Sequence, residues 1–298
     1  MRVGLVGCGR WGRHILRDLL VLGCDVPVLA RTSDSVVRAR DGGASAIVDG
    51  FADIGDVDGV VVATPTSTHA AVVEEALALG VPVFVEKPFT NDPAAAHELA
   101  TRAPDTVFVM DKWRYHAGVL ELARIARERA LGEILCLHTI RVGWERPHAD
   151  VDGAWILAPH DLSIALEILG EVPRPVAASG FSLEGGTVIH GLLEAGSVPH
   201  VLEISERSPE RRRVVRLQCE EGAATLGGGW DDHVTLHRPG EAGLVEERIE
   251  TPGELPLIAE LRAFVEHLAG GPPPRSSAAD GAAIVRAVAE LRERAGIA

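Results

Sequence analysis

Short runs of apolar residues recur along the first third of the chain, separated by stretches in which apolar residues repeat every three or four positions. The runs cover residues 2–6, 26–30, 45–48, 59–63, 81–85 and 106–110. Strands that are apolar on both faces suit a parallel sheet covered on two sides. The stretch at residues 10–22 has one apolar stripe, and Gly23 can cap its end. This alternation predicts an α/β fold with a doubly wound Rossmann domain over residues 1–115.

The pattern changes after residue 115. A helix is expected at residues 117–130, followed by segments that alternate apolar and polar residues at 175–181, 187–195, 200–207, 212–220 and 232–238. Such alternation is typical of antiparallel strands with one covered face. Two closing helices are predicted at 255–269 and 278–295. Residues 116–298 are therefore predicted to form an α+β domain with a large, mostly antiparallel, open-faced sheet.

Composition and charge exclude several classes of protein. The 298 residues include 29 basic and 43 acidic side chains, a formal net charge of −14 that repels a polyanion, so no nucleic-acid partner is expected. The four cysteines lack paired CxxC spacing, so no metal site is predicted. The chain shows neither a signal-peptide pattern nor a long uninterrupted apolar run. We therefore expect a cytoplasmic protein with no membrane partner.

A glycine-rich motif lies directly after the first predicted strand and opens the first predicted helix. It comprises Gly7, Cys8, Gly9, Arg10, Trp11 and Gly12. In this position Gly7 permits a tight turn, Gly9 lets the backbone approach a pyrophosphate, and the helix N-terminus adds partial positive charge. The alternative is a glycine-rich turn without a ligand. The context favours a dinucleotide-binding site.

The end of the second strand indicates which dinucleotide is preferred. In this fold an acidic residue at this place binds the adenosine ribose and rejects a 2′-phosphate. Here the chain has Arg31, Thr32 and Ser33, which can bind a phosphate through a guanidinium and two hydroxyls. This favours NADP, with NAD as the alternative. Arg31 could instead be a solvated residue for which Asp34 competes.

Candidate chemistry lies where the fourth and fifth strands end, because open parallel sheets bind ligands at these carboxyl ends. The candidate cofactor contacts are Ala63, Thr64, Pro65, His69, Glu86, Lys87 and Pro88. Lys87 is one of only two lysines, the other being Lys112. A cationic nicotinamide ring nearby would favour neutral Lys87, which could exchange a proton with a substrate hydroxyl. The alternative is a solvated lysine at a strand end.

Several motifs resemble the Gfo/Idh/MocA oxidoreductases, the family of glucose-fructose oxidoreductase and inositol dehydrogenase. They are GLVGCGRWG, ATPTSTH, EEALALG, VFVEKPF, LGEIL and WILAPHDLSIALEILG, in the order and approximate spacing of that family over essentially the whole chain. The sequences GRWG and APHDLSI resemble those of the branch that often acts on nucleotide-linked sugars. The resemblance implies that Lys87 contacts the reacting hydroxyl, often beside a cis Lys87–Pro88 bond. It also implies a homodimer or homotetramer formed through the C-terminal sheet.

The family's second catalytic element is an aspartate four residues before a histidine. His160 matches the histidine, but the aspartate position is Ile156, and a second common aspartate position is Ser163. An apolar side chain cannot share a proton, so the set is incomplete. Asp161, Asp150, Asp152 and Glu86 are the candidates to compensate, and Asp161 adjoins His160 directly. Without the resemblance, His160 would be read as a helix N-terminal cap or a packed polar residue.

The segment after the sixth strand carries aromatic and cationic residues. Trp113, Arg114 and Tyr115 could form a wall for a sugar or phosphate, together with Lys87 and His160. An interdomain hinge with packed aromatics is the alternative. The run from Arg211 to Arg213 is interpreted as a solvated or interface face.

The leading hypothesis is an NADP-preferring dehydrogenase or reductase acting on a CH–OH group of a small-molecule sugar, cyclitol or nucleotide-sugar. Lys87, His160 and Asp161 are its candidate catalytic residues. Because Ile156 replaces the usual aspartate, a non-catalytic nucleotide-binding sensor or interaction protein of the same fold is the main alternative. A third hypothesis is the reduction of an imine or a conjugated double bond.

Overall fold

The computed structural model describes residues 1–144 and 149–297 and divides the chain into two compact units. The first contains residues 1–112 and 255–285, and the second residues 113–254 and 286–298. The first boundary lies three residues before the predicted one. Residues 255–285 differ more, because the sequence analysis placed them in the second domain. They join the first unit because apolar side chains of this segment, including Leu261 and Phe264, are buried in its core.

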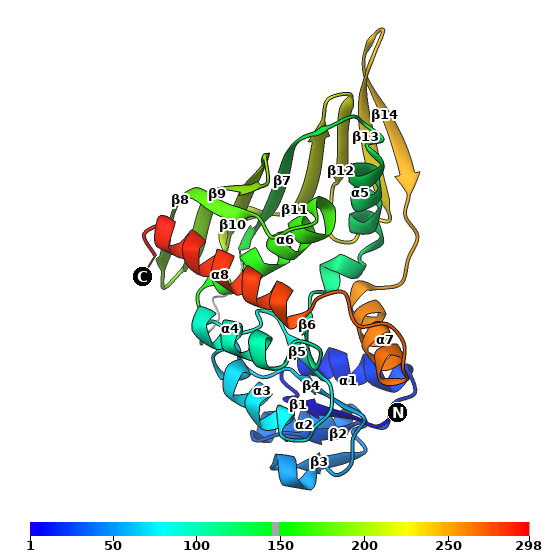
Figure 1. The fold of residues 1–298 in the computed structure, drawn as a ribbon, viewed down its shortest axis with the longest axis vertical. Coiled ribbons are helices and arrows are strands. Elements are labelled where there is room, and N and C mark those ends of the chain that lie inside the picture. The colour runs from blue at the N-terminus through cyan, green and yellow to red at the C-terminus, as the bar shows by residue number, and fades with distance from the viewer. Residues whose placement is uncertain (145–148, 298) are drawn as a thin grey trace. The chain divides into compact units, whose positions relative to one another are not determined.

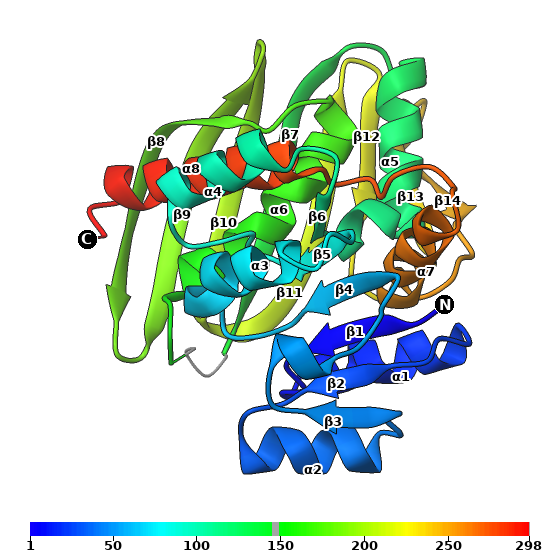
Figure 2. The same cartoon turned by 60° about the horizontal axis from the view of Figure 1, so that its bottom comes forward.

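The first unit is built on a six-stranded parallel sheet, which confirms the predicted Rossmann architecture (Figure 2). Its strands are β1 (Val3–Val6), β2 (Pro27–Leu29), β3 (Ala46–Val48), β4 (Gly59–Val62), β5 (Val83–Glu86) and β6 (Val107–Met110). Their spatial order is β3-β2-β1-β4-β5-β6, so β1 and β4 are the central neighbours at which the strand order reverses. In such sheets the ligand site lies at the carboxyl ends around this reversal.

Five helices belong wholly to the first unit. They are α1 (Gly12–Val21), α2 (Ser33–Asp41), α3 (His69–Leu77), α4 (Pro93–Arg102) and α7 (Pro256–Leu268). Thr32 and Asp92 cap α2 and α4 by accepting backbone N–H groups, as N-cap side chains do. The rings of Phe84 on β5 and Phe264 on α7 stack with centroids 4.9 Å apart, which attaches α7 to the sheet.

The second unit is built on an eight-stranded sheet in the order β14-β13-β12-β11-β7-β10-β9-β8 (Figure 1). The strands are β7 (Ile134–Trp144), β8 (Arg174–Leu183), β9 (Gly186–Ala195), β10 (Val198–Ser205), β11 (Arg207–Cys219), β12 (Gly222–Leu226), β13 (His233–Gly240) and β14 (Gly243–Glu250). β10 pairs with β7 in parallel and the other pairs are antiparallel. The mostly antiparallel sheet is confirmed; β7, β12 and β14 were not predicted.

Helices cover one face of this sheet. α5 (Ala117–Glu128) contacts β12 and β13, and α6 (Gly153–Leu169) contacts β7, β9 and β10. Exposure alternates along β8 and β9, so the other face is open. α8 (Ala278–Arg294) starts in the first unit and ends in the second. No helix in the described part of the chain is long and apolar enough to cross a membrane.

Candidate functional site

The glycine-rich turn after β1 excludes side chains where its backbone is packed. A Cβ on Gly7, whose φ is +93°, would lie 2.6 Å from the carbonyl oxygen of Ala63, and one on Gly12 would lie 2.3 Å from that of Gly7. Gly9 is different, because a Cβ there would meet nothing within 4 Å. Two glycines therefore hold the turn against β4, and the third leaves open space that a phosphate can approach. The residues present fit a dinucleotide at this turn.

Cys8 does not have the exposure that a cofactor contact needs. Its backbone N–H donates to the Ser35 hydroxyl at 3.0 Å, and its side chain is fully buried in the core of the first unit. Burial raises the pKa of the Cys8 thiol. The residue attaches the turn to α2, which differs from the predicted contact.

The end of β2 presents exposed polar side chains. Arg31 is exposed and lies 3.5 Å from the Glu75 carboxylate, whereas Asp34 pairs with Arg38 at 3.4 Å. The prediction that Asp34 competes for Arg31 is therefore wrong, because the carboxylate that pairs with Arg31 is that of Glu75. Thr32 accepts the Ser35 N–H at 3.2 Å as the cap of α2. Because an exposed ion pair is weak, Arg31 can exchange Glu75 for another anion.

His69 links two strand ends. Its Nδ1 lies 2.9 Å from the Pro88 carbonyl oxygen and its Nε2 lies 3.0 Å from the Thr64 carbonyl oxygen. The side chain is 1% exposed. Both ring nitrogens are thus used within the protein, so the structure does not favour the predicted direct cofactor contact. The residue instead holds the turn after β4 to the turn after β5.

Glu86 ends β5 and Lys87 follows it, at the same edge of the sheet as the glycine-rich turn. The Lys87–Pro88 peptide bond is cis, as the family resemblance implies. Glu86 Oε2 accepts the Lys87 backbone N–H at 3.0 Å, and Oε1 accepts the Trp11 indole N–H. The Lys112 ammonium lies 4.2 Å from the centre of a Trp11 ring. Glu86 therefore connects the glycine-rich turn to the backbone of Lys87.

In the second unit, His160 lies in the middle of α6, so the alternative of a helix N-terminal cap is wrong. The Trp113 ring packs edge-on against the His160 ring at a centroid distance of 6.4 Å. The Arg141 guanidinium lies 4.7 Å from the Trp113 ring centre. Ile156 is one helical turn before His160, so an apolar residue occupies the neighbouring position on that face.

Asp161 forms a buried ion pair. Its two carboxylate oxygens accept from Arg141 Nε at 2.8 Å and Nη2 at 3.2 Å, and the two side chains are 1% and 5% exposed. Burial raises the pKa of the Asp161 carboxyl, and the Arg141 charge and hydrogen bonds oppose that rise. With both oxygens held by Arg141, Asp161 is placed to fix Arg141 and not to exchange a proton with a substrate. This geometry disfavours its predicted catalytic role.

The predicted aromatic and cationic wall is largely packed. Trp113 is buried, and Arg114 donates to Glu167 at 2.9 Å in a nearly buried pair. His116 stacks on Trp113 and accepts the Gly118 N–H at 3.1 Å as the cap of α5. Burial lowers the pKa of His116. Tyr115 is half-buried in the same 3-10 turn. This geometry favours the packed-aromatic alternative for Trp113 and Arg114.

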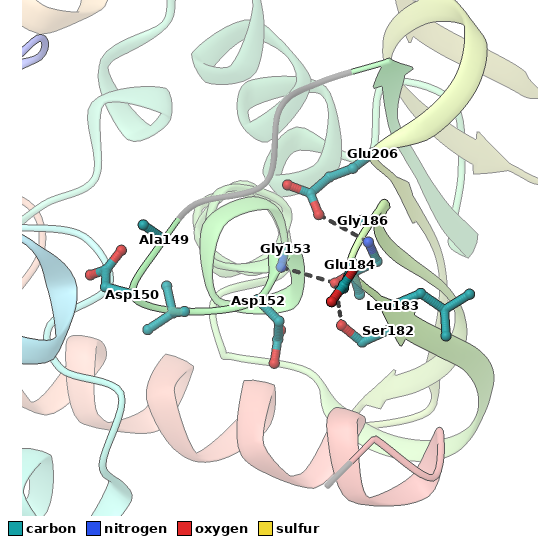
Figure 3. Close-up of a pocket in the computed structure, with 11 residues that line it drawn as sticks. Ala149, Asp150, Asp152, Gly153, Ser182, Leu183, Glu184, Gly186 and Glu206 are labelled. Carbon is teal, nitrogen blue, oxygen red and sulfur yellow. Dashed lines mark hydrogen bonds between the residues drawn. The ribbon is translucent and has the colours of Figure 1, made fainter.

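A pocket of about 370 Å³ opens beside the start of α6 (Figure 3). Its lining is acidic and comes from the segment before α6 and from β8, β9 and the end of β10: Ala149, Asp150, Val151, Asp152, Gly153, Ser182, Leu183, Glu184, Gly186, Thr187 and Glu206. Asp152 caps α6 and lies 2.8 Å from Arg292, so its carboxylate is occupied. Among residues 1–144 and 149–297, no group of three or more His, Cys, Asp or Glu side chains is arranged to hold a metal.

Sequence reasoning missed several buried charged residues, including Arg141, Glu206 and Glu260. Arg141 follows Leu137 and Thr139 on the covered side of β7, and a period of two along that segment could have identified it. Glu260 interrupts the apolar stripe of α7. Glu206, 2% exposed, accepts the Thr187 N–H at 2.9 Å, and no sequence signal distinguishes it.

Known proteins are similar to this chain in sequence and in fold. Residues 1–109 match the model of the oxidoreductase family GFO_IDH_MocA, described by its NAD-binding Rossmann fold. The UDP-N-acetylglucosamine 3-dehydrogenase of Acidithiobacillus ferrooxidans is 27% identical over 98% of this chain and 96% of its own length. An inositol 2-dehydrogenase of Acidothermus cellulolyticus is 35% identical over 46% of this chain and 44% of its own length.

Solved structures match the whole chain. The structure of the Acidithiobacillus enzyme has a TM-score of 0.86 at 22% identity and covers 100% of this chain and 98% of its own. A levoglucosan dehydrogenase in complex with NADH and levoglucosan has a TM-score of 0.86 at 17% identity, covering 99% of this chain and 97% of its own. These likenesses show a shared fold. The first 109 residues therefore match the oxidoreductase family GFO_IDH_MocA with its NAD-binding Rossmann fold, and the whole chain shares the fold of these solved structures.

Proposed function

We propose that the protein is an NADP-preferring oxidoreductase that transfers hydride between the nicotinamide and a carbinol or carbonyl carbon of a sugar, cyclitol or nucleotide-sugar. The proposal rests on what lies at the carboxyl-terminal edge of the first sheet. There the glycine-rich turn after β1 and Lys87 after β5 follow strands separated only by β4. One end binds a pyrophosphate and the other offers a proton acceptor.

The turn from Gly7 to Gly12 and the N-terminus of α1 would hold the pyrophosphate. Arg31, with the hydroxyls of Thr32 and Ser33, would bind the 2′-phosphate of NADP, and Ala63 to Pro65 would lie along the dinucleotide. The nicotinamide supplies the hydride acceptor when it is bound. The relatives include dehydrogenases of a UDP-sugar and of inositol, which supports an alcohol substrate.

Lys87 is the proposed base in the oxidation direction. Its neutral amine takes the hydroxyl proton while the C–H hydride leaves, so the alcohol becomes a carbonyl compound and Lys87 becomes an ammonium. His160 is proposed to assist at the substrate. A positioned acid–base group contributes about 10² to 10⁴ in rate. Lys87→Ala should therefore lower kcat by about this factor and leave the Kd for NADPH nearly unchanged; a variant as active as the wild type would remove Lys87 from the mechanism.

The cofactor preference is tested by titration with NADPH and NADH. Arg31→Asp should reverse the preference, because loss of a charge-assisted contact costs about ten- to a hundred-fold in affinity. Arg40→Asp, an exposed substitution with the same change of charge on α2, is the matched control and should leave the ratio of the two Kd values unchanged. An unchanged ratio in both variants would exclude Arg31 as the phosphate contact.

A second titration tests the turn. Gly9→Ala adds a methyl group that meets nothing within 4 Å in the protein, so Tm should hardly change while NADPH binding weakens. Equal binding by Gly9→Ala and the wild type would show that the pyrophosphate does not approach this glycine.

A non-catalytic nucleotide-binding role is the second candidate, and Ile156 is the observation that favours it. Of the predicted substitutes, Asp161 is held by Arg141, and Asp152 by Arg292 and the α6 cap. Ile156→Asp should create or increase dehydrogenase activity if this function has been lost from an active ancestor. An active wild type whose rate falls in Ile156→Asp would exclude this candidate.

We further propose that two copies associate through the open face of the second sheet. On this face Phe181, Leu192 and Val201 are exposed, and Leu192 is the register partner of Val201 on the neighbouring strand. Contiguous exposed apolar surface of this kind supports an interface. Leu192→Glu should lower the molar mass measured by light scattering to that of a monomer, and Leu244→Glu on the β14 hairpin is the control.

A further inference from the structure

Glu260 is a buried acidic residue in an apolar position. It lies on α7 between Leu257 and Leu261, which are buried in the core of the first unit, and it is 1% exposed. Among the residues that the structure describes, neither of its carboxyl oxygens has a hydrogen-bond partner. An ionised carboxylate in such a place would lose its hydration without compensation.

The charged groups around Glu260 come from the ends of two strands. Glu86 ends β5, and Asp111 and Lys112 follow β6; all three act electrostatically on Glu260. On α1, His14 lies near enough to Lys112 for that charge to help lower the pKa of His14. Two other carboxyl groups and one ammonium therefore act on the charge of Glu260.

Glu86 differs from Glu260 in its partners. It accepts the Trp11 indole N–H and the Lys87 backbone N–H, and the charges of Lys87 and Lys112 both favour its ionised form. Burial raises the pKa of both carboxyl groups, but only Lys112 opposes that rise at Glu260. Two carboxylates close together in a dry environment do not ionise equally, and the one with hydrogen-bond donors loses its proton first.

We propose that Glu86 and Glu260 carry one negative charge between them, with Glu86 ionised and Glu260 protonated. Ionised Glu86 is then the positioning residue for Lys87. The role at Lys87 rests on the proposed function. Through Glu86, the indole of the glycine-rich turn and the backbone of Lys87 share one carboxylate. The anion stabilises the Lys87 ammonium formed when the substrate hydroxyl gives up its proton.

The location of the proton is tested on the protein without substrate. Infrared difference spectra at neutral pH should show a protonated-carboxyl C=O band in the wild type that disappears in Glu260→Gln and persists in Glu86→Gln. Glu98→Gln, an exposed substitution on α4, is the matched control and should leave the band unchanged. A band that survives in Glu260→Gln and disappears in Glu86→Gln, or no such band in the wild type, would overturn the assignment. If Glu86→Gln does not fold, the comparison of Glu260→Gln with the wild type decides alone.

The positioning role is tested by kinetics. A nearby carboxylate raises the pKa of a lysine, so Glu86→Gln should move the acid limb of the kcat profile to lower pH and lower the plateau by about ten-fold, with the Kd for NADPH nearly constant. Trp11→Phe keeps a ring beneath Lys112 but removes the indole donor, and should shift the limb less in the same direction. An unmoved limb in Glu86→Gln would exclude this role.

The two tests separate this inference from the proposed function. If no alcohol or carbonyl substrate is turned over, the proposed function fails, but the infrared spectra still determine which carboxyl group holds the proton. If the wild type is active and the band is unaffected by Glu260→Gln, only the inference fails.

Discussion

Asp161 in the second unit and Glu260 in the first are both 1% exposed acidic residues on helices, yet their surroundings differ completely. Asp161 gives both oxygens to the Arg141 guanidinium. Glu260 has no hydrogen-bond partner among the described residues, and Glu86, Asp111 and Lys112 act on it electrostatically. Burial raises the pKa of both carboxyl groups, and the charges of Glu86 and Asp111 raise that of Glu260 further. The difference teaches that two equally buried carboxyl groups are distinguished by their partners and not by their depth.

The largest expected effect is at the paired carboxyl group. Asp161→Ala leaves the Arg141 guanidinium buried without its counter-ion, and should lower the free energy of unfolding by about 3–5 kcal/mol. Urea denaturation measures this loss. Asp34→Ala removes the exposed partner of Arg38 and should cost less than about 1 kcal/mol. A loss at Asp161 no larger than that at Asp34 would show that Arg141 is solvated.

Replacing both members of that pair sharpens the same point. Arg141→Met combined with Asp161→Leu removes both charges together, so the double variant should be more stable than Asp161→Ala and close to the wild type. Urea denaturation of the three proteins under one condition is the measurement. A double variant as unstable as the single one would mean that packing, and not charge, is lost at Asp161.

Glu260→Gln should raise the stability of the protein, whereas Asp161→Ala lowers it. Because the folded-state pKa of Glu260 is raised, its contribution to stability is fully present below the pKa of the unfolded chain and is lost as the pH rises toward the folded-state value. Glutamine cannot ionise, so the Tm of the variant should rise relative to that of the wild type as the pH increases above about 4.3, the usual pKa of glutamate. Thermal scans at several pH values test this, and a constant Tm difference would show that the pKa of Glu260 is not raised in the folded state.

A smaller effect is expected at two helix caps, one with an ion pair and one without. Asp152 caps α6 and also pairs with Arg292, whereas Asp92 caps α4 by accepting the Ala94 and Ala95 N–H groups. Asp92→Ala should cost about 1 kcal/mol, the usual value of a cap, and Asp152→Ala should cost more because a partly buried ion pair is also lost. Equal losses in urea denaturation would show that Arg292 contributes nothing.

The fold was largely predictable because hydrophobic period is a local property of the chain. All six predicted strands of the first unit lie within one or two residues of the observed ones. β14 was missed because its residues are almost all exposed, so it has no apolar period. The segment at 255–285 was placed in the second domain, whereas the structure groups it with the first unit, since an apolar stripe predicts a helix but does not say which core the helix joins.

The candidate site was predictable only in part, for a related reason. The glycine-rich motif from Gly7 to Gly12 and the tripeptide from Glu86 to Pro88 are each an unbroken stretch of sequence, so each could be located by reading along the chain. His69 was assigned to the cofactor from its place after the fourth strand, and Trp113 and Arg114 to the substrate for their aromatic and cationic character. In the structure, His69 contacts two backbone carbonyl groups, Trp113 stacks on an imidazole, and Arg114 donates to a carboxylate of the protein.

The sequence by itself determined the strands of the first unit, the glycine-rich turn and the position of Lys87 at a strand end, because each depends on neighbours within a few residues. Only the tertiary structure decided the partners of the buried charged groups. Arg141 donates to Asp161 across 20 positions of sequence, and Glu86 acts electrostatically on Glu260 across more than a hundred. Charge interactions in a dry interior depend on separation in space and on available donors, and neither is encoded by local sequence.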